Sequence, residues 1–476
     1  MQYRIIKYLT ALFLFGCFLA TMLTLQEHVM YYQEQHNLFL FSKDYIRDTL
    51  HWEGLQKLGA SFLTQFYYYP LLGAAIVSLM LASIYLMIES AIEIFTGRKD
   101  WFQVGALIAV ALYFTLDGTD ESPFLVAVTF LVMLLLMILL QVVPMKRKDS
   151  RGDKLKTRAL FMSIGMVLLY CAAGFWIEMS LYSRDERSMI LAERAVNNKD
   201  WDKVIDITSR YLATGKNNRL MLYFRNLALA NKGELTLRLF DYPQKLGING
   251  LAFPWTRNSR ETEHGHLFHE ATGDINAAHF WTFEGMTVWG ETAGILSRLG
   301  HYNAALGRKD VALKFADKLD KSLFHKAEAE SIRKEAERPG SGVYYAMPDS
   351  VSVDWLNIAD FRQNLMQNFL ADPHNVPVRQ YLIAGMLLSN SIGELLPYLE
   401  PQDLQSKPVR EALTLYSRET QDVQGAADPI EDDAAMQKDL ARFIQLYKAG
   451  DHSRLIREYA HTFWFYRYFH FDSKNP

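Results

Sequence analysis

The sequence predicts an all-α protein, with an N-terminal transmembrane helix bundle of about five spans in residues 1–182 and an α-solenoid in residues 183–476. Three observations lead to this prediction. Long apolar runs crowd into the first 182 positions, the later segments follow a helical period, and turns recur there at a fixed spacing.

Composition excludes several classes of protein. With 22% charged and 50% hydrophobic residues, the 476-residue chain is neither disordered nor fibrous. Its 50 basic and 53 acidic side chains give a net charge of −3, so we expect no nucleic acid as partner. Both cysteines, Cys17 and Cys171, lie in apolar stretches and predict no disulfide framework.

The membrane-spanning helices follow from length and hydropathy. A hydrocarbon core about 30 Å thick requires roughly 20 apolar residues of helix. The segments that approach this length are 5–25, 71–95, 102–116, 124–143 and 159–182. The third is short and marginal as a span.

The first of these segments resembles a membrane anchor more than a cleaved signal peptide. It is long for a signal core, and Thr21-Met22-Leu23 at its end do not form a small-x-small cleavage pattern. We therefore expect it to remain as a helix of the mature protein.

Basic residues in the short loops predict the orientation of the bundle. The 145–158 loop contains seven lysines and arginines and the 96–101 turn two, whereas the 117–122 loop has acids and no base. Five spans then place the amino terminus in the cytoplasm and residues 183–476 outside, in the periplasm of an inner-membrane protein. If the short third segment did not cross the membrane, residues 183–476 would lie on the same side as the amino terminus.

An aromatic-rich outer segment, residues 26–70, separates the first two spans. Aromatic rings with polar tips favour the headgroup layer, so we expect the outer segment to lie along the outer surface. Within it, Asp44 to Leu58 has the pattern of a short amphipathic helix.

The later part of the chain contains a repeat. Leu296, Leu299, Gly300, Gly307 and Ala312 follow the spacing of a tetratricopeptide (TPR) unit. The turn at Gly307 lies 34 residues after that at Gly273, as Gly233 does after Lys199. This period is typical of a helix–turn–helix repeat. The step from Gly233 to Gly273 is 40 residues, so residues 241–263 form an insertion.

More distant helical pairs follow the repeat, at 378–389 with 392–399 and at 435–448 with 453–469. The last ends in the aromatic run Trp464, Phe465, Tyr466, Tyr468 and Phe469. We expect this run either to cap the solenoid or to rest against the bilayer. Single units cannot bury their own apolar faces, so stacking supplies the core.

This layout resembles an uncharacterised family of multi-pass membrane proteins from Bacteroidota. The residues that carry the resemblance are Gln65-Phe66-Tyr67, Gly273 to Glu284, and Val409-Arg410-Glu411-Ala412-Leu413. The resemblance implies an inner-membrane location with a periplasmic, C-terminal TPR-like domain, and it implies no activity.

The insertion is the preferred place for a binding site. It contains Phe253, Trp255 and Arg257, and aromatic and arginine side chains are enriched in interface hot spots. Long insertions in solenoids also often shape the binding face. The alternative is a loop folded on its own groove, with Trp255 tucked in.

Three histidines, His264, His266 and His269, are weaker candidates for metal ligands. His266 and Glu270 share a helix face at i, i+4, a spacing that can chelate zinc. However, no cysteine is near and His266 occupies a helix-packing position of the repeat. We therefore favour packing and expect no metal. Without a phosphate-binding glycine loop, a serine nucleophile elbow or a CxxC pair in a supporting context, we expect no cofactor.

Acidic residues suggest two further functions. Glu34, Asp44 and Asp48 lie in the outer segment, where some lipid-linked glycosyltransferases place an activating acid. Glu89, Glu93 and Glu178 lie in or near spans, where ionisable groups are candidates for a transport path. All three fall close to span ends, so we expect their carboxylates to reach water.

The function that the sequence favours is binding without covalent chemistry. We expect a membrane-anchored helical-repeat scaffold that presents a protein-binding surface in the cell envelope, with the lipid bilayer and an envelope protein as partners. The alternative is a membrane enzyme of glycosyltransferase type, acting on a lipid-linked or glycan substrate at the outer surface.

Overall fold

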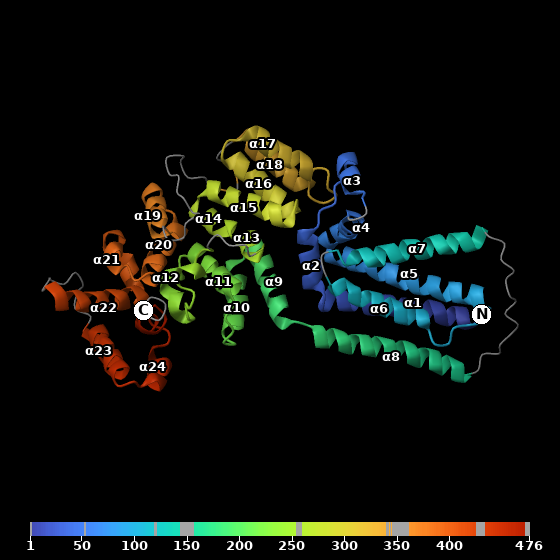
Figure 1. Cartoon of the computed structure of the whole chain (residues 1–476), viewed down its shortest axis with the longest axis horizontal. Helices are drawn as coiled ribbons and strands as arrows, with labels where there is room; N and C mark the ends of the chain where they lie inside the picture. Colours follow the sequence, from blue (N-terminus) through green and yellow to red (C-terminus); the bar gives the residue numbers. More distant parts are fainter. Residues whose placement is uncertain are drawn as a thin grey trace. The chain divides into compact units, whose positions relative to one another are not determined.

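A computed structural model describes residues 2–51, 54–118, 121–142, 157–253, 259–338, 342, 344, 361–424 and 434–471. Within these residues every regular element is helical (Figure 1). The chain divides into two compact units. The first unit comprises Met1–Arg187, Trp289–Gly300 and Asp310–Lys334, and the second comprises Ser188–Val288, His301–Lys309 and Glu335–Pro476.

Five apolar helices pack along one another in the first unit (Figure 1). They are α1 (Gln2–Thr24), α5 (Pro70–Thr96), α6 (Val104–Phe114), α7 (Pro123–Val142) and α8 (Thr157–Leu181). Each lies within a few residues of a predicted span. The basic loop 145–158 lies almost wholly outside the described residues.

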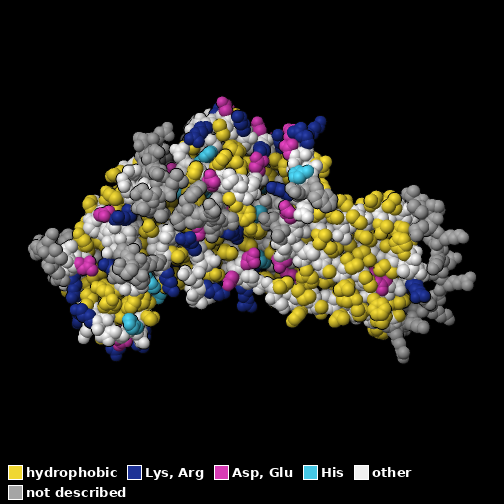
Figure 2. Space-filling view, in the orientation of Figure 1, with side chains coloured by type: hydrophobic (Ala, Val, Ile, Leu, Met, Phe, Trp, Pro, Cys, Tyr) yellow, Lys and Arg dark blue, Asp and Glu magenta, His cyan; other side chains and the backbone are white. Residues whose placement is uncertain are grey.

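Four of these helices, α1, α5, α7 and α8, are long and apolar enough to cross a membrane. Their outer surfaces carry exposed apolar side chains, and Figure 2 shows such side chains gathered over this part of the chain. Leu131, Phe161 and Trp176 are 61%, 69% and 71% exposed. A surface of this kind is stable against lipid chains and unfavourable in water.

Helix α6 is shorter than the other four. Its 11 residues rise about 16 Å, roughly half the hydrocarbon thickness. Near its start, Gln103 accepts a hydrogen bond of 2.7 Å from the Tyr85 hydroxyl of α5. Beyond its end, the Leu116 carbonyl accepts one of 2.9 Å from Gln33. Helix α6 therefore runs antiparallel to α5, from a point beside Tyr85 towards the end of the bundle that carries α2 (Glu27–His36).

The segment before α6 folds back along α5. Tyr85 precedes the end of α5 by 11 residues, so Gln103 lies about 16 Å back from that end. The Asp100 carboxylate accepts hydrogen bonds from the Phe102 and Val104 amides at 2.9 and 2.7 Å. These bonds satisfy backbone donors that lipid could not satisfy.

The outer segment forms α2 (Glu27–His36), α3 (Lys43–Thr49), α4 (Gly54–Thr64) and the 3₁₀ turn η1 (Gln65–Tyr68). The prediction of one helix from Asp44 to Leu58 is wrong, because the backbone of Leu50 leaves the helical region and ends α3. Helix α3 buries none of its side chains, whereas α4 buries one face.

A later part of the chain belongs to the same unit as the outer segment. It includes most of α17 (Lys309–Leu319), most of α18 (Lys326–Glu337) and the first part of α16 (Ala293–Ala305). Between α17 and α18, Phe324 stacks on Tyr68 with ring centroids 5.4 Å apart. The Lys321 carbonyl accepts a 2.8 Å hydrogen bond from the Phe41 amide.

The second unit is built from shorter helices. They are α9 (Arg184–Asn197), α10 (Trp201–Leu212), α11 (Arg219–Asn231), α12 (Leu235–Arg238), α13 (Ser259–His264), α14 (His266–Thr272), α15 (Ile275–Trp289), α19 (Phe361–Ala371), α20 (Val376–Leu388), α21 (Ile392–Leu395), α22 (Lys407–Gln424), α23 (Ala434–Lys448), α24 (His452–Tyr459) and α25 (Phe463–Tyr466). Short 3₁₀ turns lie between α12 and α13 and between α21 and α22, and the π-helical turn η8 (Arg467–Phe471) ends the series.

The four predicted turns all join consecutive helices. Lys199, Gly233, Gly273 and Gly307 have φ of 54°, 72°, 77° and 71°, in the left-handed region. Glycine adopts this conformation without strain, and Lys199 is a non-glycine exception. The sequence spacing therefore identified real helix-to-helix turns. The helix after Gly233 is only four residues long, and the insertion follows it.

The aromatic run at the end of the chain packs inside the second unit. Trp464 is fully buried and donates a 2.8 Å hydrogen bond from Nε1 to the Glu411 carbonyl. Tyr466 is buried as well, and its hydroxyl donates to the Leu388 carbonyl at 2.7 Å. The aromatic run was expected either to cap the solenoid or to rest against the bilayer. Burial of Trp464 and Tyr466 inside the second unit agrees with the first of these positions.

Candidate functional site

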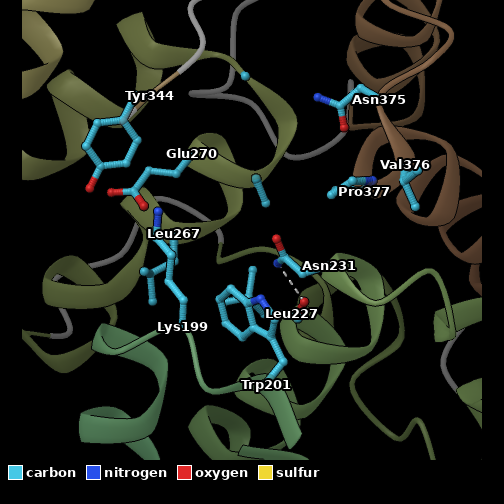
Figure 3. Close-up of a pocket in the computed structure, with 12 residues that line it drawn as sticks. Lys199, Trp201, Leu227, Asn231, Leu267, Glu270, Tyr344, Asn375, Val376 and Pro377 are labelled. Atoms are coloured by element: carbon cyan, nitrogen blue, oxygen red, sulfur yellow. Dashed lines mark hydrogen bonds between the residues drawn. The ribbon is translucent and has the colours of Figure 1, made fainter. Parts of the chain in front are cut away.

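A cavity of about 460 Å³ opens in the second unit where several helix ends meet (Figure 3). Its volume lies within the range typical of ligand sites. Turn residues and helix ends form most of its wall. The lining residues are Lys199, Trp201, Leu227, Asn231, Leu267, Glu270, Ala271, Gly273, Tyr344, Asn375, Val376 and Pro377.

Helix capping fixes the polar rim of this cavity. Asp200 caps α10 by accepting a hydrogen bond of 3.2 Å from the Lys203 amide, which places Lys199 and Trp201 at the mouth. Asn375 caps α20 in the same way, accepting from the Val378 amide at 3.0 Å. Both caps are residue types that favour helix starts.

One side of the cavity carries polar groups. The Lys199 ammonium lies 5.2 Å from the ring centroid of Tyr344, and Figure 3 shows the Glu270 carboxylate beside both. Glu270 also accepts a hydrogen bond from the Tyr302 hydroxyl. This side offers an ammonium donor and a carboxylate acceptor within one site.

The opposite side is mostly apolar with amide groups at its edge. Figure 3 shows Asn375, Val376 and Pro377 across the cavity from Lys199 and Glu270. Below them, Trp201 and Asn231 face the space, and the Asn231 amide donates to the Leu227 carbonyl at 2.9 Å. Apolar walls with a few polar groups suit the backbone and small side chains of an extended peptide.

A second cavity, of about 430 Å³, is dominated by ion pairs. Arg379 pairs with Asp403 and lies 2.9 Å from Glu400. The Gln380 side chain accepts the Thr236 amide hydrogen at 3.0 Å. Because these groups satisfy one another, this cavity is a less favourable ligand site than the first.

Of the three predicted binding residues of the insertion, the structure describes only Phe253. Phe253 is 5% exposed, and its ring lies 4.2 Å from that of Tyr223. It therefore packs in the core of the second unit. Trp255 and Arg257 lie outside the described residues.

The three candidate metal-ligating histidines point into different surroundings. His269 stacks on Trp281, and burial lowers its pKa to about 3, so it is a neutral packing residue. The His266 Nε2 lies 3.7 Å from the Glu270 Oε1, as the i, i+4 spacing predicted. His264 lies beside two glutamates, Glu193 and Glu263. The histidines therefore do not form one ligand set.

The three candidate catalytic acids of the outer segment have different partners. Glu34 is 7% exposed, burial raises its pKa, and its Oε1 lies 3.8 Å from the His325 Nε2. Asp44 and Asp48 lie on α3, largely exposed, and both pair with Arg47. A buried acid and two solvated ones do not make a matched general acid–base pair.

The expectation that the span carboxylates reach water is wrong for two of them. Glu89 is fully buried and Glu178 is 5% exposed, whereas Glu93 is half-buried. The Glu89 side chain accepts hydrogen bonds from the Tyr3 hydroxyl at 3.0 Å and from the Gly105 amide at 3.1 Å. Position near a helix end did not decide exposure, because α1 and the first turn of α6 pack against the Glu89 side chain.

Sequence reasoning located several lining residues of the first cavity but not the cavity. It identified the turns at Lys199 and Gly273. It missed Asn231, Glu270 and Tyr344 as partners of these turns, because no local pattern reports contacts between distant hairpins.

Comparisons with known proteins give one match. The chain matches a family described as "Family of unknown function (DUF6057)", over residues 1–182 and 176–470. No curated protein and no solved structure matches it. The two matched regions together cover most of the chain, and this protein therefore belongs to the DUF6057 family.

Proposed function

We propose that this protein is a membrane-anchored helical-repeat scaffold that binds a protein partner in the cell envelope. The observation that carries the proposal is the cavity of about 460 Å³ at the helix ends of the second unit. It combines an ammonium group, a carboxylate, amides and an indole ring. In this function the apolar helices hold the binding site at the membrane, and no covalent chemistry occurs.

A TPR-like solenoid is the architecture that we infer for the repeat. Four helix pairs, α9/α10, α11/α12, α14/α15 and α16/α17, each contain a turn residue with positive φ. The 34-residue spacing within two pairs of turns supports this inference, because a constant period lets equivalent helix faces stack. In such repeats, helix ends and inner faces present a groove for extended peptides.

We further propose that the protein lies in the inner membrane, with the repeat in the periplasm. The antiparallel course of α6 relative to α5 supports an odd number of crossings, even though α6 alone is short. The basic residues of the 96–101 turn and the 145–158 loop favour the cytoplasmic side for both.

Paired reporter fusions test this topology. Alkaline phosphatase fused after Pro476 should be active, and green fluorescent protein fused there should be dark. Fusions within the 145–158 loop should give the reverse pattern. A fluorescent C-terminal fusion would contradict the periplasmic location.

Site-specific photo-crosslinking of the full chain in native membranes tests the binding function. A photoreactive amino acid at Trp201 should capture one defined partner, because this ring lines the cavity. The matched control is Tyr447, which is 39% exposed and does not line it. Substituting Lys199 with Glu should abolish capture from position 201, whereas Lys448→Glu should not. Equal capture from both positions would contradict the proposal.

The alternative function, an enzyme of glycosyltransferase type, has less support. Glu34 is buried, and Asp44 and Asp48 pair with the same exposed arginine. A triple variant with all three acids replaced by amides should retain the partner captured at position 201. Loss of a glycan product in that variant would favour the enzyme instead.

A further inference from the structure

Three side chains from two helices converge within the second unit. Glu193 comes from α9, and Glu263 and His264 come from α13. The His264 Nε2 lies 3.6 Å from the Glu193 Oε2 and 3.7 Å from the Glu263 Oε2. One ligand atom from each residue lies within 4.8 Å of the other two.

Two of these side chains are almost completely buried. Glu193 is 2% exposed and His264 is 3% exposed. The Glu193 Oε2 and the His264 Nε2 face each other, and neither makes a hydrogen bond within the described residues. A buried polar atom without a hydrogen bond is costly, so a cation that both atoms could bind would stabilise this arrangement more than the 3.6 Å ion pair of Glu193 with Arg260 does alone.

We propose that Glu193, Glu263 and His264 bind a divalent transition-metal cation, for which Zn²⁺ is the probe. In a tetrahedral zinc site with bonds of about 2.1 Å, neighbouring ligand atoms lie about 3.4 Å apart. The two distances to Nε2 are close to this value. An imidazole with two carboxylates suits zinc and related cations, and it discriminates against Mg²⁺ and Ca²⁺, which prefer oxygen ligands.

The ring of His264 is already oriented for this role. It packs edge-on against Phe224, with centroids 5.1 Å apart. The backbone carbonyl of His264 accepts a 3.1 Å hydrogen bond from the Tyr223 hydroxyl. A ligand held by its surroundings loses less freedom when it binds a metal.

Arg260 is the group that would compete with the cation. Its Nη1 lies 3.2 Å from the Glu263 Oε2 and 3.6 Å from the Glu193 Oε2. Its side chain is 26% exposed, so the guanidinium can turn towards solvent when a cation binds. The other nearby arginine, Arg219, is paired with Glu261 at 2.6 Å.

Bound metal would join α9 to α13, which forms the C-terminal end of the insertion 241–263. Phe253, in the middle of the insertion, already packs in the core. The inferred role is therefore structural, and it does not depend on the proposed binding function.

Zinc titration of the full-length protein tests this site. The protein is purified in detergent without a polyhistidine tag, stripped with a chelator and titrated against a chromophoric zinc indicator. We expect one Zn²⁺ per chain, unaffected by excess Mg²⁺. His264→Gln should weaken binding by more than about 100-fold, since loss of outer-shell partners alone reaches about 10–100-fold. Arg260→Gln should strengthen it about 10-fold by removing the competing charge.

Two histidine variants serve as matched controls. His269→Gln and His266→Gln should leave the zinc affinity unchanged, because neither side chain lies in this cluster. Zinc should also raise the thermal unfolding temperature of the wild type and not that of His264→Gln. If His264→Gln fails to fold, Glu263→Gln provides the same test at a more exposed position. Absence of binding, or binding that follows His266 and not His264, would overturn the proposal.

Discussion

At the scale of single residues, the Glu411 carboxyl connects α22 to the end of the chain. It is 1% exposed, and its Oε2 accepts a 2.7 Å hydrogen bond from the Phe463 amide. The only cation paired with it in the described residues is Lys407, at 3.5 Å. Burial raises the pKa of Glu411 from an ordinary value of 4.5 to about 7.

The raised pKa predicts how stability depends on pH. The folded carboxyl keeps its proton to higher pH than the unfolded one, so its contribution to stability is complete below pH 4.5 and is lost as the pH approaches 7. The loss amounts to at most about 3 kcal/mol. Thermal unfolding followed by tryptophan fluorescence should show this decline between pH 5 and 8.

Glu411→Gln should remove that part of the pH dependence. The amide still accepts the Phe463 hydrogen bond and carries no charge, so the variant should be more stable than the wild type at pH 8. Glu419→Gln, on the exposed side of the same helix, is the control and should leave the profile unchanged. An unaltered profile in Glu411→Gln would assign the pH dependence to other groups.

At the scale of elements, the turn between α16 and α17 contains a glycine whose substitution should change backbone strain without changing side-chain packing. Gly307 has a φ of 71°, and a methyl group added there would meet no atom within 4 Å. Gly307→Ala should therefore lower the free energy of unfolding by about 1 kcal/mol through the backbone alone. Gly294→Ala, in the helical first turn of α16, should be neutral or slightly stabilising. Denaturant unfolding of both variants measures the difference.

The attachment of α6 to α5 gives a second prediction at this scale. Glu89→Leu removes the acceptor of the buried Gly105 amide, and it leaves the Tyr3 hydroxyl with only its longer hydrogen bond to the Asp100 carbonyl, at 3.3 Å. We expect a loss of about 2–5 kcal/mol, measured as thermal stability in detergent. Glu89→Gln keeps a carbonyl acceptor and should lose less. The control is Glu93→Leu, which replaces a half-buried glutamate one turn later and should have little effect on stability. An equal loss of stability in that variant would show that replacing any glutamate of α5 is costly.

At the scale of the whole molecule, chain segments far apart in sequence share the first unit. Phe324 packs among Phe66, Tyr68 and Tyr69, with ring centroids 5.4 to 6.2 Å away. The Phe41 amide is bonded to the Lys321 carbonyl nearby. The part of the chain around α17 and α18 is thus held to the outer segment by an aromatic cluster and a backbone hydrogen bond.

Removal of the Phe324 ring should loosen this attachment. Phe324→Ala should cost about 1–3 kcal/mol, because the ring is half-buried and aromatic pairs add to its packing. Hydrogen exchange should then accelerate at the Phe41 amide. The control is Leu323→Ala, since Leu323 is 42% exposed. Unchanged exchange in Phe324→Ala would show that the cluster does not hold the two segments together.

The sequence by itself determined where the long apolar helices and four of the helix-to-helix turns lie. Hydrophobic length located α1, α5, α7 and α8 to within a few residues, because a bilayer constrains each helix separately. The turns at Gly233, Gly273 and Gly307 were located because a left-handed turn favours glycine, and the turn at Lys199 was located by its spacing of 34 residues from Gly233. These signals are local, and each can be interpreted without knowing the rest of the chain.

Only the tertiary structure decided which residues meet. Lys199 and Asn375 line one cavity although 176 positions separate them, and Glu193 faces His264 across 71 positions. Glu89 is buried because the first turn of α6 packs against it, and Trp464 is buried because its indole packs against α22. Such contacts depend on how helices stack, and the apolar patterns that drive stacking are compatible with many pairings.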